Sequence, residues 1–95
     1  MSDALYPKPT KVVFQDGPLA AKTKQLIAVA VAHVTQCPYC IQGHTKGATN
    51  AGATPEEIME AIWVAAEMRA GGAVAHSTLA LATLEEHGAS HGASS

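Results

Sequence analysis

One stretch decides the fold class of this chain: Thr54-Pro55-Glu56-Glu57-Ile58-Met59-Glu60-Ala61-Ile62. Thr54 is suited to cap a helix, Pro55 is tolerated at the first helical position, and Glu57 stands where a capping box needs a carboxylate. Apolar residues then recur at helical spacing, at Ile58, Ala61, Ile62 and Ala65. The stretch predicts a helix that begins at Pro55 and that we expect Gly71-Gly72 to break.

Helices are also predicted on both sides of this one. Residues 18–36 form the first, in which residues 26–32 are apolar all round and should be buried on every side. The Ala/Val alternation there also fits a strand, but the length and the polar lead-in at residues 22–25 favour a helix. Pro38 opens a second helix that runs to about Asn50, and residues 73–87 form a last helix that ends at Gly88.

The composition supports the same fold class, an all-α helical bundle. Hydrophobic residues make up 47% of the 95 residues, but aromatic residues only 4%. Much of the apolar content is alanine, which favours closely packed helices and supplies few large side chains for a core. We therefore expect a single domain that is thinly stabilised alone and shares its core with other copies in a homo-oligomer.

The charge distribution and the lack of targeting signals argue against nucleic-acid and membrane partners. The net charge is −2, and the six Lys and Arg residues are scattered, so nothing resembles a nucleic-acid-binding surface. We see no signal-peptide pattern and no stretch that could span a bilayer, so we expect a cytoplasmic protein without a membrane partner. In that reducing setting, a close cysteine pair is more often redox-active or metal-binding than structural.

The predicted domain organisation has three parts. Residues 1–17, with the apolar patch Val12-Val13-Phe14, are expected to form an extended arm that packs against another surface. Residues 18–88 form the helical domain. Residues 89–95 are small and polar, and we expect this tail to be disordered.

The chemistry is predicted to lie at the start of the second helix. Cys37, Cys40 and His44 follow helical spacing and share one face. In the first turn, the free N–H groups and the helix dipole favour a thiolate at Cys40, and Cys37 is near enough to close a disulfide. His44, one turn after Cys40, can act as the base that takes its proton. These groups suffice for dithiol–disulfide exchange or for reduction of a peroxide.

Three other interpretations of the cysteines need to be weighed. A structural zinc site could use Cys37, Cys40 and His44 with His33 as a fourth ligand, and the cysteines could also be buried and inert. Attachment of c-type haem needs a histidine at position 41, where Ile41 stands. Our primary interpretation therefore includes neither a cofactor nor a metal.

The tetrapeptide Cys-Pro-Tyr-Cys is also the dithiol motif of glutaredoxins. A glutaredoxin or a general disulfide reductase of that kind would need strands before and after the motif. The proline after the motif, Pro55, instead fits the start of a helix, and the sequence beyond it is helical in character.

Most of the chain resembles another family, the AhpD-like branch of the carboxymuconolactone decarboxylase family. The resemblance covers about residues 18–85 and is carried by these runs: Lys22-Thr23-Lys24-Gln25-Leu26-Ile27-Ala28-Val29-Ala30-Val31, Cys37-Pro38-Tyr39-Cys40-Ile41-Gln42-Gly43-His44, Ala51-Gly52-Ala53-Thr54-Pro55-Glu56-Glu57-Ile58-Met59-Glu60-Ala61 and Gly71-Gly72-Ala73. It implies an all-helical protein in intertwined oligomers, often trimers or hexamers. AhpD-like members are thiol-dependent peroxidases, whereas the decarboxylases that name the family lack the cysteine pair.

The resemblance also implies residue roles. Cys40 would be the peroxidatic thiolate, Cys37 the resolving thiol that faces the reductant, and His44 part of a proton relay. The implied partners are a hydroperoxide substrate and a dithiol reductant or partner protein.

Two positions depart from the AhpD pattern. Gln25 stands where the pattern has a glutamate, and glutamine can bind His44 or a water but cannot take a proton. Tyr39 replaces a histidine between the cysteines. Glu60 or Glu67 could supply the missing carboxylate, although either is as readily a solvated surface residue, and His33 could line the same site. We therefore expect weak peroxidase turnover.

Overall fold

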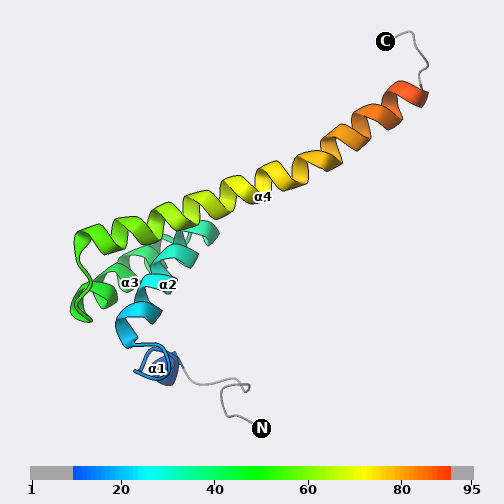
Figure 1. Ribbon diagram of the computed structural model, residues 1–95. Helices are drawn as coiled ribbons and strands as arrows, with labels where there is room; N and C mark the ends of the chain where they lie inside the picture. The colour runs from blue at the N-terminus through cyan, green and yellow to red at the C-terminus, as the bar shows by residue number, and fades with distance from the viewer. Residues whose placement is uncertain (1–9, 91–95) are drawn as a thin grey trace. The chain divides into compact units, whose positions relative to one another are not determined.

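The computed structural model describes residues 10–90 of the chain, with side chains from residue 12 to residue 89. It contains the helices α1 (Thr10–Val13), α2 (Ala21–Thr35), α3 (Pro38–Asn50) and α4 (Pro55–Ser90), and no strand within these residues (Figure 1). The all-α prediction is therefore confirmed, and the strand alternative for residues 26–32 is wrong. The first half of the predicted arm and most of the predicted disordered tail lie outside the described residues.

The chain divides into two units, one ending at Ala65 and the other beginning at Ala66. In the first unit, α2 packs against α3, and the core contains Val29 of α2, Ala48 of α3 and Ala53 of the following turn. Leu26, Ile58 and Ile62 pack around them. Because most of the fully enclosed positions are alanines, this core is small, as the composition predicts.

Within residues 10–90, only one side of α2 is covered by other parts of the structure. Val29 and Ala32 are buried, but Ile27, Val31 and Val34 remain exposed at positions that share a helix face. The prediction that residues 26–32 are buried on every side is therefore wrong for the single chain. The reason is that, in the part of the chain that the structure describes, α3 and the start of α4 supply apolar partners for one face of α2.

The segment before α2 also differs from the sequence prediction. Residues 10–13 form the helical turn α1 where an extended arm is predicted, and the amide of Gln15 donates to the carbonyl of Val12 at 3.2 Å. The helix predicted from residue 18 begins at Ala21 instead. The side chain of Asp16 accepts a hydrogen bond from the Ala21 amide at 2.7 Å, and this carboxylate satisfies one of the free N–H groups at the helix start.

A two-residue turn joins α2 to α3. Gln36 adopts a left-handed conformation, with φ 59° and ψ 50°, and its amide bonds back to the carbonyl of Ala32. Cys37 follows in an extended conformation, and Pro38 then starts α3 at the position where its missing N–H costs nothing. The reversal at Gln36 therefore places Cys37 at the N-cap of α3.

The capping box predicted at the start of α4 is confirmed. The Thr54 amide donates to the Glu57 carboxylate at 2.8 Å, and the Glu57 amide donates to the Thr54 hydroxyl at 3.1 Å. Glu57 also forms an ion pair with Lys22 of α2 at 2.8 Å. The hydrogen bond from Lys22 lowers the pKa of Glu57 below its ordinary value of 4.5, and the backbone hydrogen bond from Thr54 acts in the same direction.

No break occurs at Gly71-Gly72, so the prediction of two separate helices there is wrong. α4 is continuous from Pro55 to Ser90, and Gly88 lies inside it rather than at its end. Among the described glycines, only Gly52 has a positive φ, so Gly71 and Gly72 keep helical geometry. Each glycine costs a helix about 1 kcal/mol relative to alanine, which the good helix formers on both sides offset.

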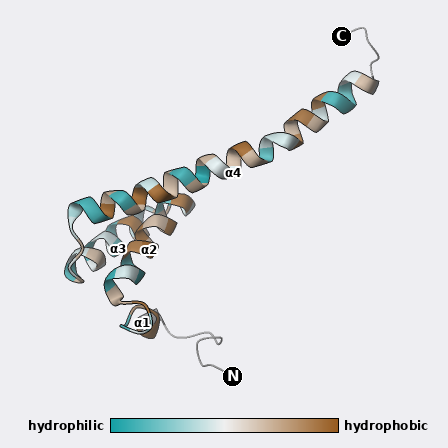
Figure 2. Ribbon diagram, in the orientation of Figure 1, coloured by the Kyte–Doolittle hydropathy of each residue, from teal (hydrophilic) through white to brown (hydrophobic). Residues whose placement is uncertain are grey.

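The second unit consists of the C-terminal part of α4. Residues 66–87 are exposed throughout, and apolar and polar residues are interspersed along the helix (Figure 2). Within residues 10–90, no helix combines the length and the apolar character that crossing a membrane requires.

Candidate functional site: a dithiol at the start of α3

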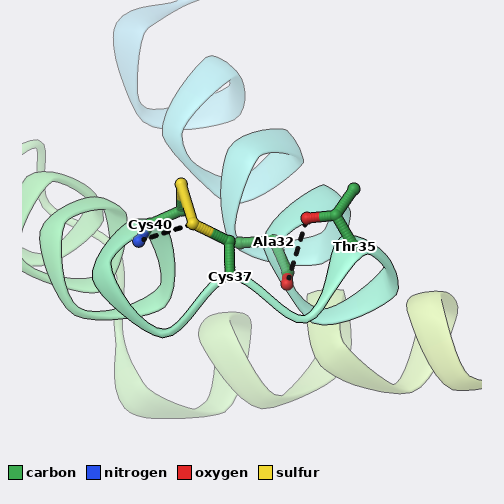
Figure 3. The surroundings of a disulfide bond; sticks show 4 residues. All are labelled: Ala32, Thr35, Cys37 and Cys40. Atoms are coloured by element: carbon green, nitrogen blue, oxygen red, sulfur yellow. Dashed lines mark hydrogen bonds between the residues drawn. A yellow bond between two sulfur atoms is a disulfide. The ribbon is translucent and has the colours of Figure 1, made fainter.

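Cys37 and Cys40 form a disulfide across the first turn of α3, with their Cα atoms 5.2 Å apart (Figure 3). Both residues are half-buried, and Tyr39 between them is 85% exposed. The preceding turn is held by backbone hydrogen bonds, including one from the Cys37 amide to the Ala32 carbonyl at 3.1 Å. The pair is therefore fixed by local structure at a place that a reagent in solution can approach.

The sulfur of Cys37 also caps α3. The amide of Cys40 donates to Cys37 Sγ at 3.4 Å, and the amide of Ile41 donates to the carbonyl of Cys37 at 2.9 Å. Backbone N–H groups at a helix start favour negative charge on such a sulfur. The amide of Cys40 is therefore placed to favour negative charge on the sulfur of Cys37.

His44 lies one turn after Cys40 on α3 and is held by two contacts. Its Nδ1 is 2.9 Å from Gln25 Oε1 of α2, and its ring centroid is 4.9 Å from that of Phe14. His44 and Gln25 are both half-buried. The sequence suggests that Gln25 binds either His44 or a water. The structure places Gln25 against His44.

Within the first unit, neither His33 nor Glu60 forms a hydrogen bond with His44 among the described residues. His33 Nδ1 donates to the carbonyl of Val29 in its own helix at 2.8 Å. Glu60 is exposed and makes no hydrogen bond to His44 among the described residues. Glu67 is exposed and belongs to the second unit.

The alternative interpretation, a structural zinc site, lacks a suitable set of ligands in the part of the chain that the structure describes. No group of three or more His, Cys, Asp and Glu side chains there is arranged to hold a metal ion. Cys37 and Cys40 are bonded to each other, and His33 points its Nδ1 at a backbone carbonyl.

Sequence reasoning misses two residues of the site. Phe14 stands out in the sequence only as part of an apolar patch, and its contact with His44 cannot be inferred across a separation of 30 positions. Gly47 carries a weak signal, because glycine in a helix interior is unfavourable and can indicate close approach of a neighbour. Here that neighbour is Gln25.

Comparison with known proteins identifies the family. Residues 8–83 match the family model described as the carboxymuconolactone decarboxylase family. "Uncharacterized protein 4 in cox locus" of Paracoccus denitrificans is 73% identical over 77 residues, which are 81% of this chain and 69% of that protein. An uncharacterized protein of Cupriavidus necator is 39% identical over 72 residues, which are 76% of this chain and 64% of that protein. The chain thus spans about two thirds of the length of these curated relatives.

Two solved structures share the fold. A crystal structure of a Methanobacterium thermoautotrophicum protein superposes with a TM-score of 0.67 at 36% identity, covering 73% of this chain and 78% of that one. A crystal structure of a Thermotoga maritima protein superposes with a TM-score of 0.60 at 33% identity, covering 80% of this chain and 68% of that one. By its sequence and its helical fold, this chain belongs to the carboxymuconolactone decarboxylase family.

Proposed function

We propose that the protein is a thiol-dependent peroxidase of the AhpD-like branch of this family. The single observation that carries the proposal is the Cys37–Cys40 pair, which is close enough to bond and stands one helical turn before His44. The decarboxylase branch lacks such a pair, so its chemistry has no use for this feature. A glutaredoxin fold is excluded because the described residues contain no strand.

In the proposed cycle, His44, Cys40 and Cys37 act one after another. His44 takes the proton of the Cys40 thiol, and the thiolate attacks one oxygen of a hydroperoxide ROOH. The O–O bond breaks, Cys40 becomes a sulfenic acid, and the leaving alkoxide takes the proton from His44 to give the alcohol ROH. The Cys37 thiol then attacks the Cys40 sulfur, releasing water and forming the disulfide. A dithiol reductant exchanges with this disulfide and leaves both cysteines reduced.

The direct test is the intact mass of reduced protein before and after one equivalent of an organic hydroperoxide. We expect a loss of two hydrogens per chain, with one equivalent of alcohol released. A protein that resists the hydroperoxide but is oxidised by a protein disulfide would instead be a disulfide reductase. Bound stoichiometric zinc and no response to either oxidant would overturn the thiol-redox proposal.

Single cysteine variants assign the two sulfurs. Cys40→Ser should not react with the hydroperoxide, whereas Cys37→Ser should gain one oxygen as a sulfenic acid, which a dimedone-type reagent traps. The reverse pattern would mean that Cys37, whose sulfur the Cys40 amide contacts, is the peroxidatic residue. His44→Ala should slow the reaction and raise the pH at which the peroxidatic thiol becomes reactive.

We also propose that the protein works as a homo-oligomer, with a trimer or a hexamer expected. The exposed large apolar residues of α2 and of residues 66–87 support this, because one chain leaves them in water. Val74, Leu79, Leu81 and Leu84 do not lie on one narrow stripe of α4, so a single flat partner would not cover them. We propose that further copies of the same chain cover these residues, because each copy exposes the same apolar side chains and buries them when the copies associate.

A further inference from the structure

Gly47 of α3 lies directly against the side chain of Gln25 of α2. A Cβ atom at position 47 would stand 2.7 Å from Gln25 Cδ, 2.7 Å from Oε1 and 2.9 Å from Nε2. All three distances are shorter than non-bonded carbon contacts allow, since optimal separations are about 3.5–4.0 Å. Gln25 can therefore occupy its present position only because residue 47 has no side chain.

The same Gln25 amide holds His44, which lies three residues before Gly47 on α3. Residues at this spacing are neighbours on a helix surface, so one amide from α2 can contact both positions. The Oε1 atom of Gln25 is 2.9 Å from His44 Nδ1. On the same helix, a Cβ atom added at Gly43 would have no neighbour within 4 Å, so the close approach is specific to Gly47.

We infer that Gly47 and Gln25 are positioning residues that together fix the tautomer of His44, with hydrogen on Nδ1 and a free lone pair on Nε2. An amide oxygen has no hydrogen to donate, so the ring nitrogen that contacts it must donate. In a neutral imidazole the other nitrogen is then the acceptor. Nε2 is thus the atom left to take a proton.

The consequence for turnover rests on the proposed function. Nε2 is the atom that accepts the Cys40 proton and returns it to the leaving alkoxide in the cycle above. Gln25 cannot itself gain a proton, so it orients the base without joining the transfer. The ring of Phe14 also packs near the imidazole, with the two ring centroids 4.9 Å apart.

The test begins with the tautomer, which does not depend on peroxidase activity. Long-range proton–nitrogen correlation spectra of reduced, nitrogen-15-labelled protein, recorded at mildly alkaline pH, identify the protonated ring nitrogen. We expect hydrogen on Nδ1 of His44 in the unaltered protein and in Gly43→Ala, the matched control on the same helix. Hydrogen on Nε2 in the unaltered protein would overturn the inference.

Variants then connect Gly47 to Gln25. Gly47→Ala and Gln25→Ala should each give a mixture of tautomers and lower the rate constant for peroxide-driven oxidation about tenfold, the order of one lost hydrogen bond. In the double variant the small side chain at position 25 removes the clash, so its rate and spectrum should equal those of Gln25→Ala alone. This variant also keeps the test open if Gly47→Ala does not fold.

Two further outcomes separate this inference from the proposed function. If Gly47→Ala keeps the single tautomer and the rate of the Gly43→Ala control, or if the effects of the two substitutions simply add, Gly47 does not act through Gln25. If the tautomers behave as expected but neither the unaltered protein nor any variant reacts with a hydroperoxide, the positioning role stands and the peroxidase proposal fails.

Discussion

The helix α2 and the C-terminal part of α4 are built from similar residues but differ in burial. Both are rich in alanine and aliphatic side chains, yet Val29 of α2 is fully buried while Val74 of α4 is 70% exposed. The difference is not one of helix propensity, since both segments are helical. It depends on whether another part of the same chain lies against the helix, which α3 does for α2.

The two regions also differ in what holds their helices in place. The first unit has a reciprocal cap at Thr54 and Glu57, an ion pair from Lys22, and a side-chain contact between Gln25 and His44. In residues 66–89, Ser and Thr hydroxyls donate to carbonyls of the preceding turn of the same helix. The first unit thus combines a local cap with side-chain contacts between elements, whereas these hydroxyl hydrogen bonds of the second unit stay within one helix.

The largest effect is expected from placing a charge on the exposed apolar part of α4. Leu81→Glu should weaken self-association at least about tenfold, because a carboxylate would have to be desolvated where copies meet. Sedimentation velocity over a range of concentrations would measure this. Gln42→Glu, which adds the same charge at an exposed polar position of α3, is the control and should leave the association state unchanged. A Leu81→Glu protein of unaltered size would mean that other copies do not cover this part of α4.

A matched pair of valine substitutions would compare the two regions directly. Val29→Ala should lower the free energy of unfolding by about 2 kcal/mol, because it leaves a cavity at a fully buried position. Val74→Ala makes the same chemical change at an exposed position, so it should have little effect on the dissociated chain and act mainly on assembly. Chemical denaturation at two protein concentrations separates these effects. Equal losses of unfolding free energy for both variants at every protein concentration would contradict the proposed difference between the two regions.

The smallest effect is expected at the ion pair between α2 and α4. Because Lys22 lowers the pKa of Glu57, the stabilisation is fully present above the pKa that Glu57 has in the unfolded chain. It is then lost as the pH falls through the lower pKa of the folded state. Glu57→Gln keeps a capping-box side chain but cannot titrate, so its stability should depend less on pH in the acidic range.

The measurement is the thermal unfolding midpoint from neutral pH down to about pH 3. Glu56→Gln, at an exposed neighbouring glutamate outside the ion pair, is the matched control. The same acid sensitivity in Glu57→Gln and in the control would show that the Lys22 contact does not contribute.

Local signals allow much of the fold to be predicted from the sequence. Thr54, Pro55 and Glu57 are close in sequence, and their cap depends on backbone groups within one turn, so the start of α4 follows directly. The same holds for Pro38 and the start of α3. The break predicted at Gly71-Gly72 is wrong because it treats a modest helix cost as a stop signal, although nothing there requires a positive φ.

The candidate site is predictable to the same degree. The spacing of Cys37, Cys40 and His44 on one helix needs no tertiary information, and the disulfide lies within one turn of α3. The sequence leaves open which of Gln25, Glu60, Glu67 and His33 meets His44, because that choice depends on how α2 packs against α3. The structure places Gln25 there.

The sequence by itself thus determined the elements whose causes are local: the starts of α3 and α4, the dithiol pair and the histidine one turn later. The tertiary structure alone decided which faces are covered, that Phe14 contacts His44, and that the missing side chain of Gly47 makes room for Gln25. The physical reason is range. Caps and i, i+3 or i, i+4 relations are set by helix geometry, whereas a contact between two helices depends on the shapes of both surfaces and on their relative position.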